Sequence, residues 1–190
     1  GDMQTSGAAE ATHVPTPLRE KRPDIAYCSY DNAFVTIANT CAVTGSSIFL
    51  ALAERMPNVR FAAVPTWGTN EEDRRALERV PNITVLDPVD NIDRILERTR
   101  VLLVPSLWAE ARSRIIGEAM LRGVPVVASK AGGIPEAKLG VEYLIPVTTI
   151  SHYETRLAEH MVPVSIVPPH DLAPCHPPSA ALVRDPPHHQ

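Results

Sequence analysis

The chain lacks a basic excess, a cysteine framework and any long apolar run, and each absence excludes a class of protein. Its 18 lysines and arginines are outnumbered by 22 acidic residues, so general nucleic-acid binding, which needs a basic surface, is not expected. Three cysteines without a CxxC pair form no even-numbered framework, which favours a reducing, cytoplasmic setting. No apolar stretch approaches the ~20 residues of a membrane span, and residues 1–20 lack the apolar segment of a signal peptide.

The sequence contains enough apolar material for one folded domain, and proline marks its expected limit. At 190 residues with 44% apolar side chains, the chain can bury a single core. Of its 19 prolines, eight fall in residues 163–190, where missing N–H donors exclude long helices and central strands. Residues 1–22 carry few large apolar side chains. We therefore expect a flexible lead at 1–22, a folded domain at 23–147 and a proline-rich, largely irregular tail at 148–190.

Within the expected domain, strand-like and helix-like segments alternate along the chain. Apolar and β-branched runs predict strands at 34–38, 59–64, 83–86, 101–104, 124–128 and 141–147. Apolar periodicity and terminal signals predict helices at 46–56, 70–80, 92–98, 113–122 and 135–139. Strands that alternate with helices build right-handed βαβ units and a parallel sheet with helices on both faces. The sequence therefore predicts an α/β, Rossmann-like domain.

Three loops are placed to bind a ligand. In an open parallel sheet, ligands bind beyond the carboxyl ends of the strands, and the loops at 39–45, 105–112 and 129–134 each follow a strand and precede a helix. Each loop can therefore present free backbone N–H groups at a helix N-terminus, an arrangement that suits a phosphate group. The tandem Gly-x-Gly of a dinucleotide-binding fingerprint is absent from the sequence.

The second loop and the helix after it carry two glutamates separated by seven residues, Glu110 and Glu118. Carboxylates accept the paired hydroxyl donors that a sugar or a ribose presents. The alternative is that Glu118 only forms ion pairs with Arg114 and Arg122, which share its helical face at a spacing of four residues. Glu110 could equally be a solvated loop residue.

The third loop and the two tryptophans are weaker signals. Gly132 and Gly133 allow the backbone to approach a ligand closely, although a Gly-Gly pair before a helix can also be only a turn. Trp67 and Trp108 are interpreted as packing residues, and Trp108 is also placed, next to Glu110, to border a ligand.

In order along the chain, these segments resemble the donor-binding signature of family 4 glycosyltransferases, enzymes of the GT-B fold. The shared pattern is Pro-Ser, a glutamate, seven residues, a second glutamate with Ala-Met, then Gly-x-Pro-Val-Val-Ala and Gly-Gly-x-x-Glu, all present in PSLWAEARSRIIGEAMLRGVPVVASKAGGIPE. The resemblance covers about residues 34–147, which correspond to the nucleotide-sugar-binding half of a two-domain enzyme. It implies retaining glycosyl transfer from a nucleotide-diphosphate sugar, without a metal or another cofactor.

The resemblance also implies roles for individual residues. Glu110 would face the donor sugar as the catalytic residue, and Glu118 would hold the ribose hydroxyls. The remaining implied donor-binding positions lie near the sugar, the diphosphate or the base, and they are Gly45, Pro88, Val89, Arg112, Ser113, Gly132 and Gly133.

The sequence departs from the family pattern where positive charge is expected. Family members usually carry a lysine before the glycine of the first loop, where this chain has Thr44, and an aromatic-Gly pair where it has Arg112 and Ser113. Arg112, Arg114 or Lys130 could supply the missing charge, or could be solvated basic residues. Stabilising a leaving diphosphate is a large electrostatic contribution in such chemistry, so this departure bears directly on activity.

Residues 1–22 cannot form the acceptor half of such an enzyme. We therefore expect the chain to be inactive without an acceptor-domain partner. Two alternatives stay open at this point. One is a non-catalytic nucleotide-sugar-binding module or degenerate remnant, and the other is a nucleotide-sugar epimerase of the GT-B type.

Overall fold

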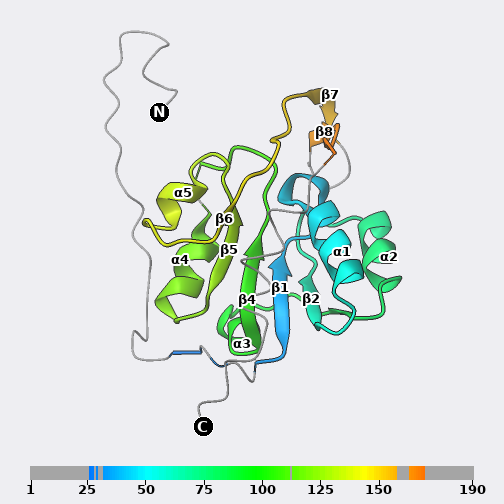
Figure 1. Ribbon diagram of the computed structural model, residues 1–190. Helices are drawn as coiled ribbons and strands as arrows, with labels where there is room; N and C mark the ends of the chain where they lie inside the picture. Colours follow the sequence, from blue (N-terminus) through cyan, green and yellow to red (C-terminus); the bar gives the residue numbers. More distant parts are fainter. Residues whose placement is uncertain (1–25, 28, 30–31, 112, 158–162, 170–190) are drawn as a thin grey trace.

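The protein is built on a single six-stranded sheet in which all neighbouring strands run parallel, in the order β3-β2-β1-β4-β5-β6 (Figure 1). The computed structural model describes residues 26–27, 29, 32–111, 113–157 and 163–169. The strands are β1 Phe34–Ala38, β2 Phe61–Val64, β3 Ile83–Val85, β4 Thr99–Val104, β5 Val126–Ser129 and β6 Leu144–Ile145. This order is that of a Rossmann-type sheet, so the α/β prediction is confirmed.

Helices lie between the strands, as the alternating pattern predicts. They are α1 Ser46–Arg55, α2 Glu71–Glu78, α3 Asp93–Leu96, α4 Arg114–Leu121 and α5 Ile134–Ala137, with a short 3-10 turn, η2, at Ala42–Thr44. The last strand, β6, is shorter than its predicted segment. Tyr143, inside that segment, has φ of 71°, a left-handed backbone that is incompatible with extended strand there.

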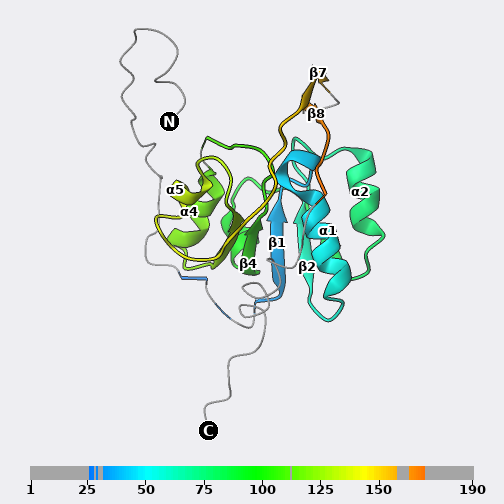
Figure 2. The same ribbon diagram turned by 45° about the horizontal axis from the view of Figure 1, so that its top comes forward.

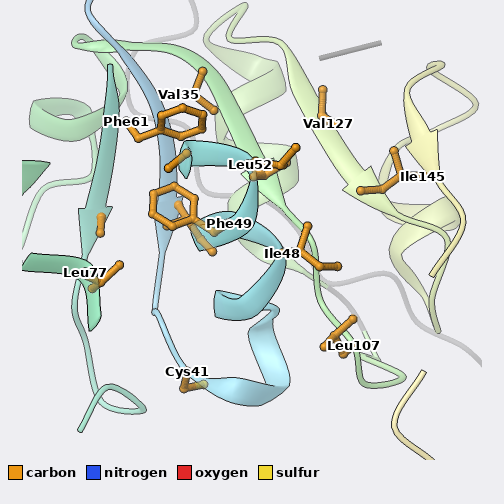
Figure 3. Packing of buried hydrophobic residues seen from close by; sticks show 14 of the residues in the cluster. Val35, Cys41, Ile48, Phe49, Leu52, Phe61, Leu77, Leu107, Val127 and Ile145 are labelled. Atoms are coloured by element: carbon orange, nitrogen blue, oxygen red, sulfur yellow. The ribbon is translucent and has the colours of Figure 1, made fainter. Parts of the chain in front are cut away.

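The core has two halves because successive residues of the central strands point to opposite faces of the sheet. On β4, Val101 and Leu103 join the cluster under α1 and α2, whereas Leu102 and Val104 join the cluster under α4 and α5. Figure 3 shows the first cluster, in which the rings of Phe49 on α1 and Phe61 on β2 pack edge to face with centroids 5.5 Å apart. The nearly continuous apolar strands seen in the sequence are therefore buried on both faces.

The order of the strands reverses between β1 and β4, and this reversal opens the sheet at one end. Pairing of β1 with β4 ends at Thr36↔Leu102. Pairing of β1 with β2 continues to Ala38↔Val64, and pairing of β4 with β5 continues to Val104↔Ala128. The carboxyl ends of β1 and β4 are therefore held by their outer neighbours and not by each other.

Ordered structure continues past the boundary predicted at residue 147. Ile150 is buried, and its N–H donates to the Leu107 carbonyl at 2.7 Å. Two short strands, β7 Tyr153–Leu157 and β8 Pro163–Ser165, pair antiparallel, and both views place them beyond the carboxyl ends of the main strands (Figures 1 and 2). The domain boundaries themselves stay a prediction. Within the described part of the chain, none of the helices has the length and apolar character needed to cross a bilayer.

Asn82 ties the C-terminal end of α1 to the segment between α2 and β3. Its Nδ2 lies 3.0 Å from the carbonyl oxygens of Ala53 and Met56 and 2.9 Å from that of Val59. These carbonyls belong to the last turn of the helix and the turn after it, where partners within the helix run out. One side chain therefore supplies the C-terminal cap of α1.

We expect Asn82→Ala to lower the free energy of unfolding by about 1–3 kcal/mol, because the three carbonyls lose the hydrogen bonds that the amide donates. Urea denaturation measures this change. Glu54→Ala, at an exposed position on α1, is the matched control and should stay within about 0.5 kcal/mol of the wild type. Equal stability of the two variants would show that the amide is not the cap.

Lys138, just after α5, is a buried lysine. Its side chain is 1% exposed, and its Nζ donates a hydrogen bond to the Val126 carbonyl on β5. Burial lowers the pKa of the Lys138 ammonium below its ordinary value of 10.5, because the charged form loses hydration. The unfolded chain therefore binds this proton more tightly than the folded chain does.

A depressed lysine pKa in the folded state means that stability rises with pH up to the unfolded pKa. We expect the stability of the wild type, measured relative to Lys138→Met, to increase as pH is raised from neutral toward 10. Urea unfolding of both proteins at a series of pH values checks this. A stability difference that stays constant with pH, or one that falls, would contradict it.

Candidate functional site

The carboxyl ends of β1 and β4 enclose a cleft of about 680 Å³. This is where the strand order reverses, the usual ligand position in an open α/β sheet. Most of the lining is uncharged. The charged side chains among its described residues are Glu110, Arg114 and Glu118.

Glu110 lies in the loop between β4 and α4, and its carboxylate is oriented by two neighbours. The Ser106 hydroxyl and the Trp108 indole N–H, the latter at 3.1 Å, both donate to Oε1. Ser106 is itself buried, and its carbonyl accepts a hydrogen bond from the Ser129 hydroxyl at 2.7 Å. Because both donors use one oxygen, Oε2 keeps its acceptor capacity for a ligand in the cleft.

Glu118 lies on α4 and also lines the cleft. Its carboxylate makes no hydrogen bond or ion pair within the described residues. Arg122, one turn later, instead pairs with the Asp93 carboxylate, and its Nη1 donates to the Glu118 backbone carbonyl at 2.9 Å. The ion pair between Glu118 and Arg122 that the helical spacing allows is therefore not formed.

The N-terminus of α4 opens onto this cleft at a point between Glu110 and Glu118 in the sequence. Ser113 is the N-cap residue, is only 8% exposed, and makes no capping hydrogen bond with its side chain. The first N–H groups of a helix have no partner within it, and the aligned peptide dipoles add partial positive charge there. This helix end is therefore suited to an anionic group.

Gly132 and Gly133 do not line the cleft, which differs from the prediction that their amides face a donor. The Gly133 N–H donates to the Glu110 carbonyl at 2.7 Å. A Cβ added to Gly132 would lie 2.6 Å from the Ala109 carbonyl carbon and from the Glu110 carbonyl oxygen. The two glycines thus let the α5 loop press directly on the backbone of the Glu110 loop.

Gly45 likewise allows the loop before α1 to pack closely against the loop after β4. It has φ of 84° at the start of α1, and an added Cβ would lie 2.1 Å from the Pro105 carbonyl oxygen. It does not line the cleft. Its neighbour Thr44 does, but the Thr44 hydroxyl is bonded to the carbonyls of Asn39 and Cys41.

Of the remaining predicted positions that the structure describes, Arg114 reaches the cleft and the others do not. Pro88 and Val89 follow β3 and are absent from its lining. Lys130 is exposed and also lies outside the lining, whereas Arg114 is exposed and lines it. Arg112 lies outside the described residues.

The sequence analysis missed Trp67. This residue lines the cleft and is 56% exposed, so its interpretation as a packing residue is wrong. Trp108 is half-buried against the core and also binds Glu110. The position of Trp67 in the sequence could have indicated this, because it follows β2 and therefore lies in a loop at the carboxyl ends of the strands.

Comparison with known proteins identifies the family. The family model described as glycosyl transferases group 1 matches residues 44–161, more than half of the chain. A sequence comparison with curated proteins gives no match.

Several solved glycosyltransferase structures are similar to the chain. AviGT4, a glycosyltransferase involved in avilamycin A biosynthesis, matches with a TM-score of 0.57 and 19% identity over 74% of this chain and 45% of its own. HepE from Anabaena, solved in complex with UDP-glucose, matches with a TM-score of 0.51 and 26% identity, covering 61% of this chain and 35% of its own. A glycosyltransferase from Rickettsia africae matches with a TM-score of 0.53 and 14% identity, covering 63% of this chain and 34% of its own.

The chain thus spans less than half the length of each of these three proteins. Two of them are less than 25% identical to it and show the fold alone. The family model, together with the parallel sheet and these similar folds, leads to one conclusion: the chain belongs to the glycosyl transferases group 1 family.

Proposed function

We propose that the cleft binds a nucleotide-diphosphate sugar and that the chain is the donor-binding part of a retaining glycosyltransferase. The observation that carries the proposal is the Glu118 carboxylate, which lines the cleft with no partner among the described residues. A carboxylate left without a protein partner beside a helix N-terminus has acceptor capacity for ligand hydroxyls. That HepE was solved with UDP-glucose supports this class of ligand.

Each part of such a donor has a candidate partner. The diphosphate lies at the N-terminus of α4 beside Ser113, where backbone N–H groups have no partner within the helix. Glu118 accepts the ribose hydroxyls, and Oε2 of Glu110 accepts hydroxyls of the sugar as the catalytic contact. Ser106 and Trp108 hold Glu110 in orientation through Oε1.

Positive charge for the diphosphate comes from the α4 side of the cleft. The loop before Gly45 contributes the Thr44 hydroxyl, which is already bonded within its own loop. Arg114 lines the cleft, and we assign it, with Arg112, to the diphosphate. We further propose that an acceptor domain completes the enzyme and that it acts in the cytoplasm.

The uncharged first loop favours a second candidate, a nucleotide-sugar-binding module without catalytic activity. Diphosphate leaving groups are stabilised by charge that is in place before the reaction, and Thr44 supplies none. Turnover with an acceptor-domain partner separates the two functions. Donor binding without transfer in the completed assembly would favour the module.

Glu118→Gln tests the donor site directly. The amide keeps the shape but loses one charged acceptor, so we expect affinity for UDP, measured by calorimetry, to fall roughly tenfold to a hundredfold. Thermal stability should barely change, because the carboxylate has no described partner to lose. Glu78→Gln, at an exposed position on α2, should bind UDP like the wild type. Equal UDP affinities for Glu118→Gln and the wild type would remove Glu118 from the site.

Gly132→Ala tests whether the α5 loop positions Glu110. A Cβ at this position meets the backbone of Ala109 and Glu110 at 2.6 Å, so the Glu110 loop has to shift. Gly140→Ala is the matched control, since Gly140 also has positive φ but an added Cβ there meets nothing within 4 Å.

We expect Gly140→Ala to cost only the left-handed strain, about 1–2 kcal/mol. Gly132→Ala should cost about 1–3 kcal/mol more and should weaken binding of UDP-glucose more than binding of UDP. Urea denaturation and calorimetry measure the two effects. If the two variants behave alike, the close approach does not hold Glu110.

A further inference from the structure

Trp67 stands out because a large apolar ring is exposed at the edge of the cleft. It lies between β2 and α2, is 56% exposed and lines the cleft. A tryptophan buries most of its surface when it packs in a core, and this one does not. More than half of its surface is therefore available to a partner in the cleft.

The loop that carries Trp67 is fastened to the loop after β1. The Gly68 N–H donates to Oδ1 of Asn39 at 3.1 Å. The hydroxyls of Thr40 and Thr69 are hydrogen-bonded at 3.1 Å. Both bonds are made by residues just after Trp67, so the backbone that carries the indole is fastened before any ligand arrives, which lowers the entropic cost of binding.

The same loops accept unusual backbone conformations and close contacts. Asn39 has φ of 60°, in the left-handed region that residues other than glycine rarely adopt. A Cβ added to Gly68 would lie 2.9 Å from Oδ1 of Asn39 and 3.0 Å from Sγ of Cys41. A larger residue at position 68 would therefore force the Asn39 or Cys41 side chain to shift.

The two sides of the cleft differ in chemistry. The charged lining residues, Glu110, Arg114 and Glu118, come from α4 and the loop before it. The β1 and β2 side contributes the uncharged Asn39 and Trp67. A ligand that fills both sides needs hydroxyls and negative charge at one part and a flat ring at another.

We propose that Trp67 is the stacking platform for the nucleobase of the bound nucleotide. The inference rests on the proposed function and names the residue that holds the base. Pro88 and Val89, predicted to border the base, do not line the cleft, whereas Trp67 does. Every base has a π-face, so stacking on an indole contributes to affinity whichever base is present.

The experiment uses the full chain with Trp67→Ala and Trp67→Phe. Wild-type protein is first titrated by calorimetry with UDP, ADP and GDP, and the tightest ligand and its glucose conjugate are then used throughout. Trp67→Ala should weaken both ligands by the same factor, about tenfold to a hundredfold, and Trp67→Phe should retain most of the affinity. Melting curves should be nearly unchanged, because the wild-type ring is largely exposed.

A matched control is Tyr143→Ala, which removes another partly exposed aromatic ring that does not line the cleft. It should leave the affinity for both ligands unchanged. The chain has two tryptophans, so Trp108→Phe leaves Trp67 as the sole tryptophan fluorophore. Binding of the nucleoside diphosphate should then quench its emission.

Different failures point to different errors. Loss of affinity for the glucose conjugate alone would place the sugar, and not the base, on Trp67 and overturn the inference. Unchanged affinity in Trp67→Ala, with Glu118→Gln still weakened, would overturn the inference and leave the proposed function standing. No binding of any of the three nucleotides by the wild type would overturn both.

Discussion

The structure depends on the separation of β1 and β4 at their carboxyl ends. Ladder pairing between them stops at Thr36↔Leu102, while each continues to pair with its outer neighbour for two more residues. The outer pairing holds the strand ends apart, so the loops after β1 and β4 leave in different directions and a cleft remains between them. Glu110, Glu118 and Trp67, which carry the proposed donor contacts, all line that cleft.

Close backbone approaches then hold the cleft walls in position. Gly45 packs on the Pro105 carbonyl, Gly132 packs on the Glu110 backbone, and Gly68 packs on the Asn39 side chain. At each contact a Cβ would come within 3.0 Å of its neighbour. These glycines are used in contacts between loops of the protein itself. This explains why they do not line the cleft, although the sequence predicts Gly45 and Gly132 to be ligand contacts.

Most of the fold could be predicted from the sequence, and so could part of the site. Apolar runs such as 101–104 can be buried only between two layers, and their alternation with helices leaves a parallel sheet as the solution. The resemblance to the family signature singled out Glu110 and Glu118, and both glutamates line the cleft. The role of Gly133 was misjudged because its N–H is used by the Glu110 carbonyl, a contact between residues 23 positions apart that no local pattern indicates.

The sequence by itself determined the sheet class, the helix positions and the family, because these follow from periodicity, local propensity and an ordered motif. Only the tertiary structure decided which groups are available to a ligand. Whether Glu118 is paired, whether Ser113 caps its helix and whether Trp67 is buried all depend on which segments meet across the sheet. Such long-range contacts are set by the packing of the whole chain. They decide which side chains are buried or hydrogen-bonded within the protein and which remain available to a ligand.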